Sequence, residues 1–243
     1  MNNKKYVEIL DTTLRDGEQT PGVAFAPAEK LAIAQMLYSN LKVDRLEIGS
    51  ARVSDGEAVS VHKILEWANN CGAIDAMEIL GFVDGGKSID WICNAGGRVM
   101  NLLAKGYIKH CEIQLKKTPE QHYSDVEKCI ELAVEKGLKV NVYLEDWSSG
   151  MKNSPEYVEN FMNNLSSMPV DRVMLPDTLG IARPDELQEY FVQMKKNWPQ
   201  MRMDFHGHND YGMVTANSLA AVRAGKDVAL ANKETLVTGG DLV

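Results

Sequence analysis

The chain has 243 residues, of which 44% are hydrophobic and 25% charged, and 26 Lys and Arg against 34 Asp and Glu give a net charge of −8 at pH 7. This composition is typical of globular proteins and excludes a disordered chain, because there is enough apolar mass to bury a core. No apolar run reaches the roughly 18 residues of a transmembrane helix, and no basic stripe suits nucleic acid. We therefore expect a protein that binds neither a membrane nor nucleic acid.

The N-terminus and the cysteines indicate the compartment. Residues 1–6 contain two lysines with no apolar segment behind them, so no signal peptide is expected. The cysteines form no C-x-x-C pair and are predicted to be reduced, mostly buried thiols; they are Cys71, Cys93, Cys111 and Cys129. Both features predict a cytoplasmic protein.

Short apolar runs that suit strands alternate with segments in which apolar residues recur at helical spacing. The predicted strands cover residues 7–10, 45–48, 77–83, 111–115, 139–144, 172–175, 203–206 and 227–231. The predicted helices between them cover residues 28–41, 60–69, 91–105, 124–136, 155–165, 185–196 and 214–224. Gly137 marks the end of one helix, and Pro184 lies near the start of another.

Strict alternation of strands and helices with short loops predicts parallel strands. Such strands form either an open doubly wound sheet or a closed barrel. Eight units in a chain of this length favour the barrel, whose usual size is about 250 residues. The expected fold is therefore a (β/α)8 TIM barrel, as a single catalytic domain over residues 1–243 with polar residues at the ends of its strands.

Two histidines at the end of the strand predicted over residues 203–206 are candidate metal ligands. Side chains alternate along a strand, so His206 and His208 point to the same side, which in a barrel can be the lumen. Two imidazoles and one carboxylate suit a divalent metal. An H-x-H pattern alone also occurs in ordinary surface or core histidines, but here Asn209 and Asp210 follow directly.

A polar segment, D-T-T-L-R-D-G-E-Q at residues 11–19, follows the first predicted strand. Arg15 and Asp16 within it form either a structural ion pair or a functional pair. In the second case Asp16 is the third metal ligand, and Arg15 is a fixed cation that stabilises an anionic substrate beside the metal.

Two further segments place polar residues at strand ends. Asp177 and Thr178 follow an apolar run, where a simple capped turn is the alternative to a binding role. Glu47 lies within an apolar strand, and helices cover the outside of a parallel barrel, so its carboxylate is expected to face the lumen and pair with Arg15.

Together these segments resemble a known family. The opening D-T-T-L-R-D-G-E-Q, the acid in the second strand, P-D-T-x-G at 176–180 and H-x-H-N-D-x-G-x-x-x-A-N at 206–217 occur in order. They are similar to the family of 2-isopropylmalate, homocitrate and citramalate synthases, metal-dependent TIM barrels related to hydroxymethylglutaryl-CoA lyase. The opening is similar to the synthase branch. The resemblance extends from Tyr6 to Gly225.

The resemblance implies an acyltransferase of amino-acid biosynthesis, for example of leucine, that condenses acetyl-CoA with a 2-oxo acid and then hydrolyses the thioester. It implies a divalent metal, Zn²⁺, Mn²⁺ or Mg²⁺, and a homodimer. The implied residues are Asp16, His206 and His208 as metal ligands, Arg15 as the group that polarises the carbonyl, Glu47 as its partner, Gln19 near the acyl group, Thr178 on the substrate carboxylate, and Asn209 and Asp210 as supports of the ligand loop.

The C-terminal segment departs from this family. The family carries a glycine-rich loop after its eighth strand, whereas this chain has A-N-K-E-T-L-V at 231–237, which resembles a stretch of 1-deoxyxylulose-5-phosphate reductoisomerase. We expect no lid domain and no regulatory domain within the chain. Two alternatives to the synthase therefore stay open: a carbon–carbon lyase, and a metal-binding barrel fragment without turnover.

Overall fold

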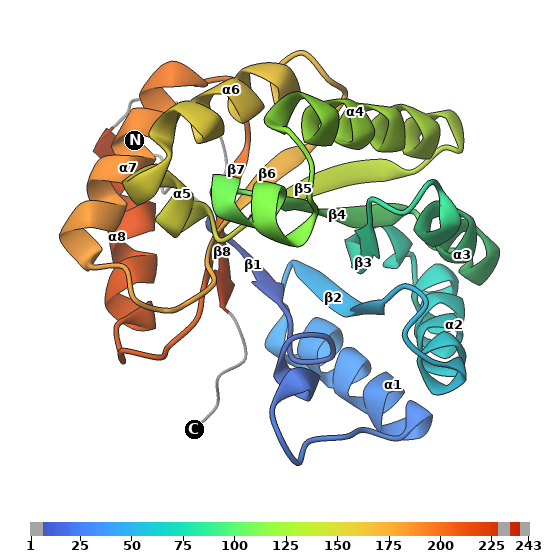
Figure 1. The fold of residues 1–243 in the computed structure, drawn as a ribbon. Coiled ribbons are helices and arrows are strands. Elements are labelled where there is room, and N and C mark those ends of the chain that lie inside the picture. Colours follow the sequence, from blue (N-terminus) through green and yellow to red (C-terminus); the bar gives the residue numbers. More distant parts are fainter. Residues whose placement is uncertain (1–6, 228–233, 239–243) are drawn as a thin grey trace.

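The computed structural model describes residues 7–227 and 234–238 and forms a closed barrel of parallel strands, which confirms the predicted fold class (Figure 1). Each strand pairs with the next along the chain, and the last pairs with the first. The strands are β1 (Val7–Asp11), β2 (Arg45–Ser50), β3 (Met77–Phe82), β4 (Val99–Lys105), β5 (Lys139–Glu145), β6 (Arg172–Asp177), β7 (Met203–Gly207) and β8 (Glu234–Thr238).

Helices surround the barrel and cover the outer faces of its strands (Figure 1). They are α1 (Pro27–Gln35), α2 (Asp55–Asn70), α3 (Lys87–Ala95), α4 (Pro119–Glu135), α5 (Trp147–Asn153), α6 (Pro155–Leu165), α7 (Pro184–Asn197) and α8 (Val214–Asp227). Local sequence explains several starts. Ser54 accepts a hydrogen bond from the backbone of Glu57 at the start of α2, and Thr118 forms a capping box with Gln121 before α4. Among the helices that the structure describes, none combines the length and the hydropathy of a transmembrane segment.

The fourth strand corrects the sequence prediction. Residues 91–105 were expected as one helix and 111–115 as a strand, but α3 ends at Ala95, β4 follows over Val99–Lys105, and residues 110–114 form a helical turn. Gly96 has a left-handed backbone (φ 88°) that ends α3. Periodicity alone does not separate a short buried strand from a helical segment, and Ile113 is 68% exposed, which a buried strand does not allow.

Two smaller differences concern the second half of the chain. The short helix α5 follows β5 after a single residue and was not predicted. The eighth strand was expected over residues 227–231. Asp227 belongs to α8, residues 228–231 lie outside the described part, and the strand that closes the barrel is Glu234–Thr238.

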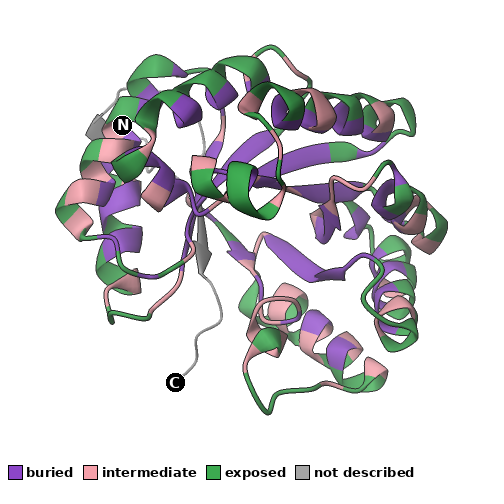
Figure 2. Cartoon of the chain, viewed as in Figure 1, coloured by how far each residue is buried: buried purple, intermediate pink, exposed green. Residues whose placement is uncertain are grey.

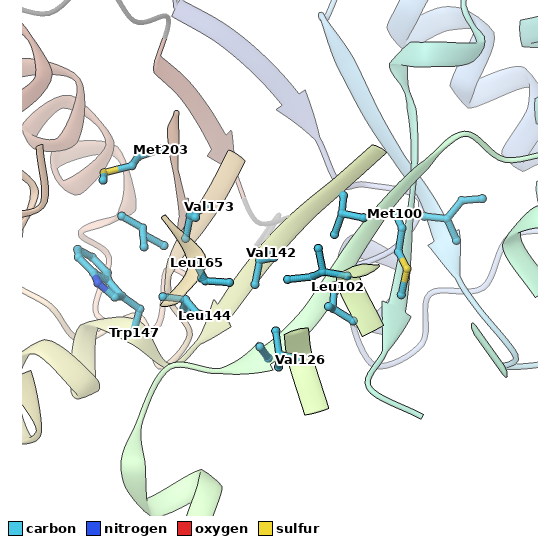
Figure 3. Packing of buried hydrophobic residues seen from close by; sticks show 14 of the residues in the cluster. Met100, Leu102, Val126, Val142, Leu144, Trp147, Leu165, Val173 and Met203 are labelled. Carbon is cyan, nitrogen blue, oxygen red and sulfur yellow. The ribbon is translucent and has the colours of Figure 1, made fainter. Parts of the chain in front are cut away.

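The main core lies between the strands and the helices, where buried residues line the outside of the sheet (Figure 2). Alternation places Leu102 of β4 and Leu144 of β5 on this outer face. Figure 3 shows them packed among buried side chains that include Val126 of α4 and Leu165 of α6. The inward-facing residues are thereby left to line the lumen.

The lumen has two different ends. Near the amino ends of the strands it is filled by buried ion pairs. Arg45 contacts Glu78 (2.7 Å) and Asp204 (2.6 Å), and Arg172 contacts Asp204 (3.0 Å) and Glu8 (2.9 Å). These charged side chains fill the lumen at the amino ends of the strands. A ligand therefore has access from the carboxyl ends, as in other barrels of this type.

Candidate active site

The carboxyl ends of β1 and β7 bring together the three residues that the sequence grouped as candidate metal ligands. One ligand atom from each of Asp16, His206 and His208 lies within 4.8 Å of the other two. Oδ2 of Asp16 is 2.8 Å from Nε2 of His206 and 3.6 Å from Nε2 of His208, and the two Nε2 atoms are 3.3 Å apart. Three donor atoms therefore face one small volume.

The chemistry of these donors suits a metal ion. Oδ2 of Asp16 is buried and has no hydrogen bond within the described residues, although two imidazole nitrogens lie nearby. Burial lowers the pKa of His206 in spite of Asp16, which favours the neutral ring that can donate a lone pair. Burial opposes ionisation of Asp16, but His206 and Arg15 outweigh it and hold the pKa of the carboxyl below its usual range. Two nitrogens and one carboxylate suit Zn²⁺ or Mn²⁺ better than Mg²⁺.

Arg15 lies beside this set and is fixed by a chain of buried side chains. Its Nε is 2.5 Å from Oε2 of Glu47, and its Nη1 is 3.1 Å from Oδ1 of Asp16. Asn101 donates a hydrogen bond to the other oxygen of Glu47 (2.7 Å), and Asn141 donates to Asn101 (2.8 Å). The predicted pairing of Glu47 with Arg15 inside the lumen is therefore confirmed.

Electrostatics keep Arg15 charged. Burial opposes its charge, but Glu47, Tyr143 and Asp16 raise the pKa of the guanidinium above its usual value. Burial raises the pKa of Glu47 in spite of Arg15 and Asn101. The result is a fixed cation within hydrogen-bonding distance of a candidate metal ligand.

An apolar cluster fills the lumen beside this polar set. It consists of Leu10, Leu80, Tyr143 and Met174, with Phe82 and Leu103 packed against it. The Tyr143 ring lies 5.8 Å from the Arg15 guanidinium carbon and 5.6 Å from the His206 ring. Its buried hydroxyl has no hydrogen-bond partner among the described residues.

The end of β6 is linked to the candidate metal ligand His208 by a backbone hydrogen bond. The carbonyl of Asp177 accepts the N–H of His208 (3.2 Å). Its buried carboxylate accepts from Ser148 (2.8 Å) and from the N–H of Ala182 (3.0 Å). Thr178 is half-buried, and its hydroxyl accepts the N–H of Asp146 (2.9 Å). Thr178 is therefore placed at the same end of the barrel as the three ligands.

The two residues predicted to support the ligand loop lie directly after His208. Asn209 accepts a hydrogen bond from the N–H of Val214 (3.2 Å), at the start of α8. Asp210 is exposed and packs against Gly180, where an added Cβ would lie 2.6 Å from Oδ2 of Asp210. Both residues thus join the loop after β7 to neighbouring segments.

Gln19 is exposed and lies at the end of the turn that follows β1. With Arg15 it lines a cavity of about 390 Å³ between the loop after β1 and the start of α2. The buried Lys30 also lines this cavity and contacts Glu18 and Glu57, each at 2.5 Å. The cavity reaches from Arg15 to the surface.

Several residues that build the site were not among the predicted ones: Asn101, Asn141, Tyr143, Asp146 and Ser148. Asn101 was assigned to a helix because β4 was misplaced. β5 does carry a local signal. Polar residues occupy every second position of this apolar strand, at Asn141 and Tyr143, and this alternation predicts that both face the lumen. No local sequence pattern indicates Ser148, because its role depends on α5.

Comparisons with known proteins support this picture. The model of the HMGL-like family matches residues 6–230. The (R)-citramalate synthase of Methanocaldococcus jannaschii is 34% identical over 90% of this chain and 43% of its own length. The 2-isopropylmalate synthase of Sulfurisphaera tokodaii is 31% identical over 92% and 56%, and the homocitrate synthase of Methanopyrus kandleri is 35% identical over 90% and 53%. The chain thus spans about half the length of these relatives.

Solved structures share the fold at lower identity. The hydroxymethylglutaryl-CoA lyase of Pseudomonas aeruginosa superposes with a TM-score of 0.75 at 18% identity, covering 97% of this chain and 77% of that one. At this identity the likeness concerns the barrel. The family model, in contrast, matches the sequence over more than nine-tenths of the chain, including every segment that builds the site. The chain belongs to the HMGL-like family.

Proposed function

We propose that this chain is the catalytic barrel of an acyltransferase that condenses acetyl-CoA with a 2-oxo acid, with Asp16, His206 and His208 holding a divalent metal. The observation that carries the proposal is the convergence of these three side chains beside a buried arginine. The synthases among the relatives support the same reaction class. A divalent cation at this position would act as a Lewis acid on the carbonyl of the oxo acid.

Arg15 supplies the second positive group of the reaction. The methyl carbon of acetyl-CoA gives its proton to a general base and attacks the carbonyl carbon of the oxo acid. The electron pair of the carbonyl double bond moves to the carbonyl oxygen, so negative charge develops there until that oxygen takes up a proton. A guanidinium already held by Glu47 needs no reorganisation to stabilise that charge. Water then cleaves the thioester and releases the thiol of CoA.

The apolar cluster beside the site supports one class of 2-oxo acid. Leu80, Leu103 and Met174 offer no cation to a second carboxylate, and burial of a carboxylate among them would be costly. A methyl or branched alkyl substituent would instead gain from burial there. We therefore propose pyruvate or 2-oxoisovalerate, rather than 2-oxoglutarate, as the type of substrate.

The cavity between the loop after β1 and the start of α2 is the proposed entry for the acyl thioester. It is continuous with Arg15, and its volume of about 390 Å³ suits an extended chain. Gln19 lines it and is proposed to lie near the acyl group. Thr178, on the other side of the site, is proposed to bind the carboxylate of the oxo acid, while Asn209 and Asp210 hold the loop that carries His208.

Release of the CoA thiol tests the proposal. Acetyl-CoA is incubated with the protein, with Mn²⁺ or Zn²⁺, and with pyruvate, 2-oxobutyrate, 2-oxoisovalerate or 2-oxoglutarate in turn. We expect thiol release with an oxo acid whose substituent is apolar, and none with 2-oxoglutarate. The variant Asp16→Asn, which removes a charged ligand, should release no thiol with any of them.

Two outcomes would contradict the proposal. Absence of thiol release from folded, metal-loaded protein would favour a barrel fragment without turnover. Cleavage of a 3-hydroxyacyl-CoA into acetyl-CoA and an oxo acid or ketone would favour a lyase. The proposal also includes a cytoplasmic location and a homodimer, and sedimentation analysis of the purified protein tests the dimer.

A further inference from the structure

The turn between β5 and α5 consists of one residue in an unusual conformation. β5 ends at Glu145, α5 begins at Trp147, and Asp146 between them has a left-handed backbone (φ 60°, ψ 35°). A residue with a side chain adopts this conformation at a cost in free energy, whereas glycine adopts it freely. Aspartate tolerates this conformation better than most residues because its short side chain can bond locally, so the contacts of the Asp146 carboxyl show what accompanies the turn.

That side chain connects two strand ends. The Asp146 carboxyl is 2% exposed, and its Oδ2 lies 3.4 Å from Nε2 of His110, in the helical turn that follows β4. The His110 ring also packs against Tyr107, with 5.7 Å between ring centroids. Burial raises the pKa of the Asp146 carboxyl, and Ser149 and His110 act against that rise. The pair ties the loop after β4 to the start of α5.

The start of α5 is held against its neighbours on two further sides. Ser148 donates to the Asp177 carboxylate, at the end of β6. Gly150 lies against the loop after β4 so closely that an added Cβ would come within 2.1 Å of the Gly106 carbonyl oxygen. The backbone at Asp146 therefore has a fixed position relative to both β4 and β6.

The Asp146 backbone in turn determines how Thr178 can act. Its N–H donates to the Thr178 hydroxyl oxygen at 2.9 Å. A threonine hydroxyl has one proton to donate and rotates to suit its partners. With the Asp146 N–H on one of its lone pairs, the Thr178 hydroxyl directs its own proton away from Asp146.

We propose that His110 and Asp146 form a positioning pair, which fixes the Asp146 N–H on Thr178 and thereby aims the Thr178 hydroxyl proton at the carboxylate of the bound substrate. The inference rests on the proposed function, which supplies that carboxylate. Neither member of the pair touches the substrate, and both act through Thr178.

Four variants test the inference by steady-state kinetics, with the KM of the oxo acid and that of acetyl-CoA measured separately. Thr178→Val removes the hydroxyl and should raise the KM of the oxo acid about tenfold or more. His110→Phe keeps the ring against Tyr107 but removes Nε2, and Asp146→Gly keeps the turn and the N–H but removes the carboxyl. Each of these should raise that KM by about three- to tenfold, a fraction of the hydroxyl's own effect. The control Asp125→Asn, on α4, breaks an ion pair with Lys117 just before that helix and should change neither KM.

Two comparisons separate positioning from simple stabilisation. The double variant His110→Phe/Thr178→Val should bind the oxo acid no more weakly than Thr178→Val alone, because both changes act on one hydrogen bond. Asp146→Gly relieves the left-handed backbone, so we expect its Tm to be maintained or raised while its KM rises.

Three results would overturn the inference. Additive effects in the double variant would mean that His110 acts independently of Thr178. An unchanged oxo-acid KM in Asp146→Gly, with wild-type turnover intact, would mean that the carboxyl positions nothing. Absence of CoA release by the wild-type protein would instead remove the proposed function, and this inference with it.

Discussion

At the scale of single residues, the site depends on a few buried polar side chains that face one another. Asp16, His206 and His208 share one small volume, and Arg15 is held beside them by Glu47. The charged members are paired, Arg15 with Glu47 and with Asp16, which is the condition for keeping charge inside a protein.

Replacing His208 by Ala should remove bound metal from this site at metal concentrations that load the wild type. His208 offers one of three candidate ligand atoms, and its ring is 24% exposed, so its removal leaves the core intact. We expect at least about a tenfold loss of affinity for Zn²⁺ or Mn²⁺, in line with the cost of disturbing metal sites. Equilibrium dialysis followed by elemental analysis measures it.

His62→Ala is the matched control for that experiment, because His62 is an exposed histidine on α2. This variant should bind metal as the wild type does. Equal metal content in His208→Ala and His62→Ala would show that the three grouped side chains do not form the metal site.

Replacing Arg15 by Lys should preserve metal binding and reduce turnover. Lysine keeps the charge but loses the planar fork that contacts Glu47 and Asp16 together. Removal of one preorganised donor costs about 10²–10³ in kcat. The measurement is the kcat for CoA release, with Arg52→Lys, in an exposed pair with Asp84, as the control. Wild-type turnover in Arg15→Lys would exclude a catalytic role for the guanidinium.

At the scale of elements, helices outside the barrel hold the strand ends that carry the site. His122 of α4 accepts the N–H of Lys105 (3.0 Å), and Tyr157 of α6 donates to the carbonyl of the same residue (2.8 Å). Lys105 also forms an ion pair with Glu145 of β5. Two helices thus hold the end of β4, where its pairing with β5 ends at Lys105 and Glu145.

The hydrogen bond from Lys105 requires a neutral His122, which makes stability depend on pH. Burial lowers the pKa of His122 from 6.5 to about 4 in the folded protein, with Lys117 and Lys105 acting in the same direction. The unfolded chain therefore binds more protons in this range, and stability should fall as pH decreases from 6.5 to 4, by roughly 3 kcal/mol in total.

His122→Gln isolates this effect, because the amide oxygen of glutamine can accept the same N–H without titrating. Urea unfolding of both proteins at several pH values between 4 and 7 gives the two slopes. We expect a shallower slope in the variant, and identical slopes would contradict a neutral buried histidine at this position.

At the scale of the whole molecule, the barrel has one end closed by charge and one end open to ligands. Arg45 illustrates the closed end, since it contacts Glu78 and Asp204 within the lumen. Breaking a buried ion pair by removing one partner is more costly than losing a surface pair, because the remaining charge stays buried.

Arg45→Met should therefore destabilise the fold by about 3–5 kcal/mol. Arg98→Met, which removes an exposed partner of Asp75, should cost less than about 1 kcal/mol. The free energy of unfolding in urea measures both. A loss as small in Arg45→Met as in Arg98→Met would show that the charges at the closed end do not support the barrel.

Most elements of this fold could be predicted from the sequence, and the errors have physical causes. Strands such as β2 and β7, bounded by charged and polar residues, were found near their true limits, whereas β4 was assigned to a helix. The run that forms β4 is buried on both faces, so it lacks the alternation that identifies a strand. The turn at 110–114 differs, because only Cys111 within it is buried, and a short run of alternating apolar residues there predicts a strand that the structure does not form.

The barrel, the residue types of the site and the grouping of Asp16 with His206 and His208 could be predicted from the sequence, because the period of apolar residues and the motifs at strand ends are local properties. The distances within that group come from the closed sheet, which brings the segment after β1 beside the end of β7. The tertiary structure alone shows which residues support the site: Asn101 donates a hydrogen bond to Glu47, and the N–H of Asp146 donates to Thr178. These contacts join different strands, and no pattern along one strand specifies which neighbour it will meet.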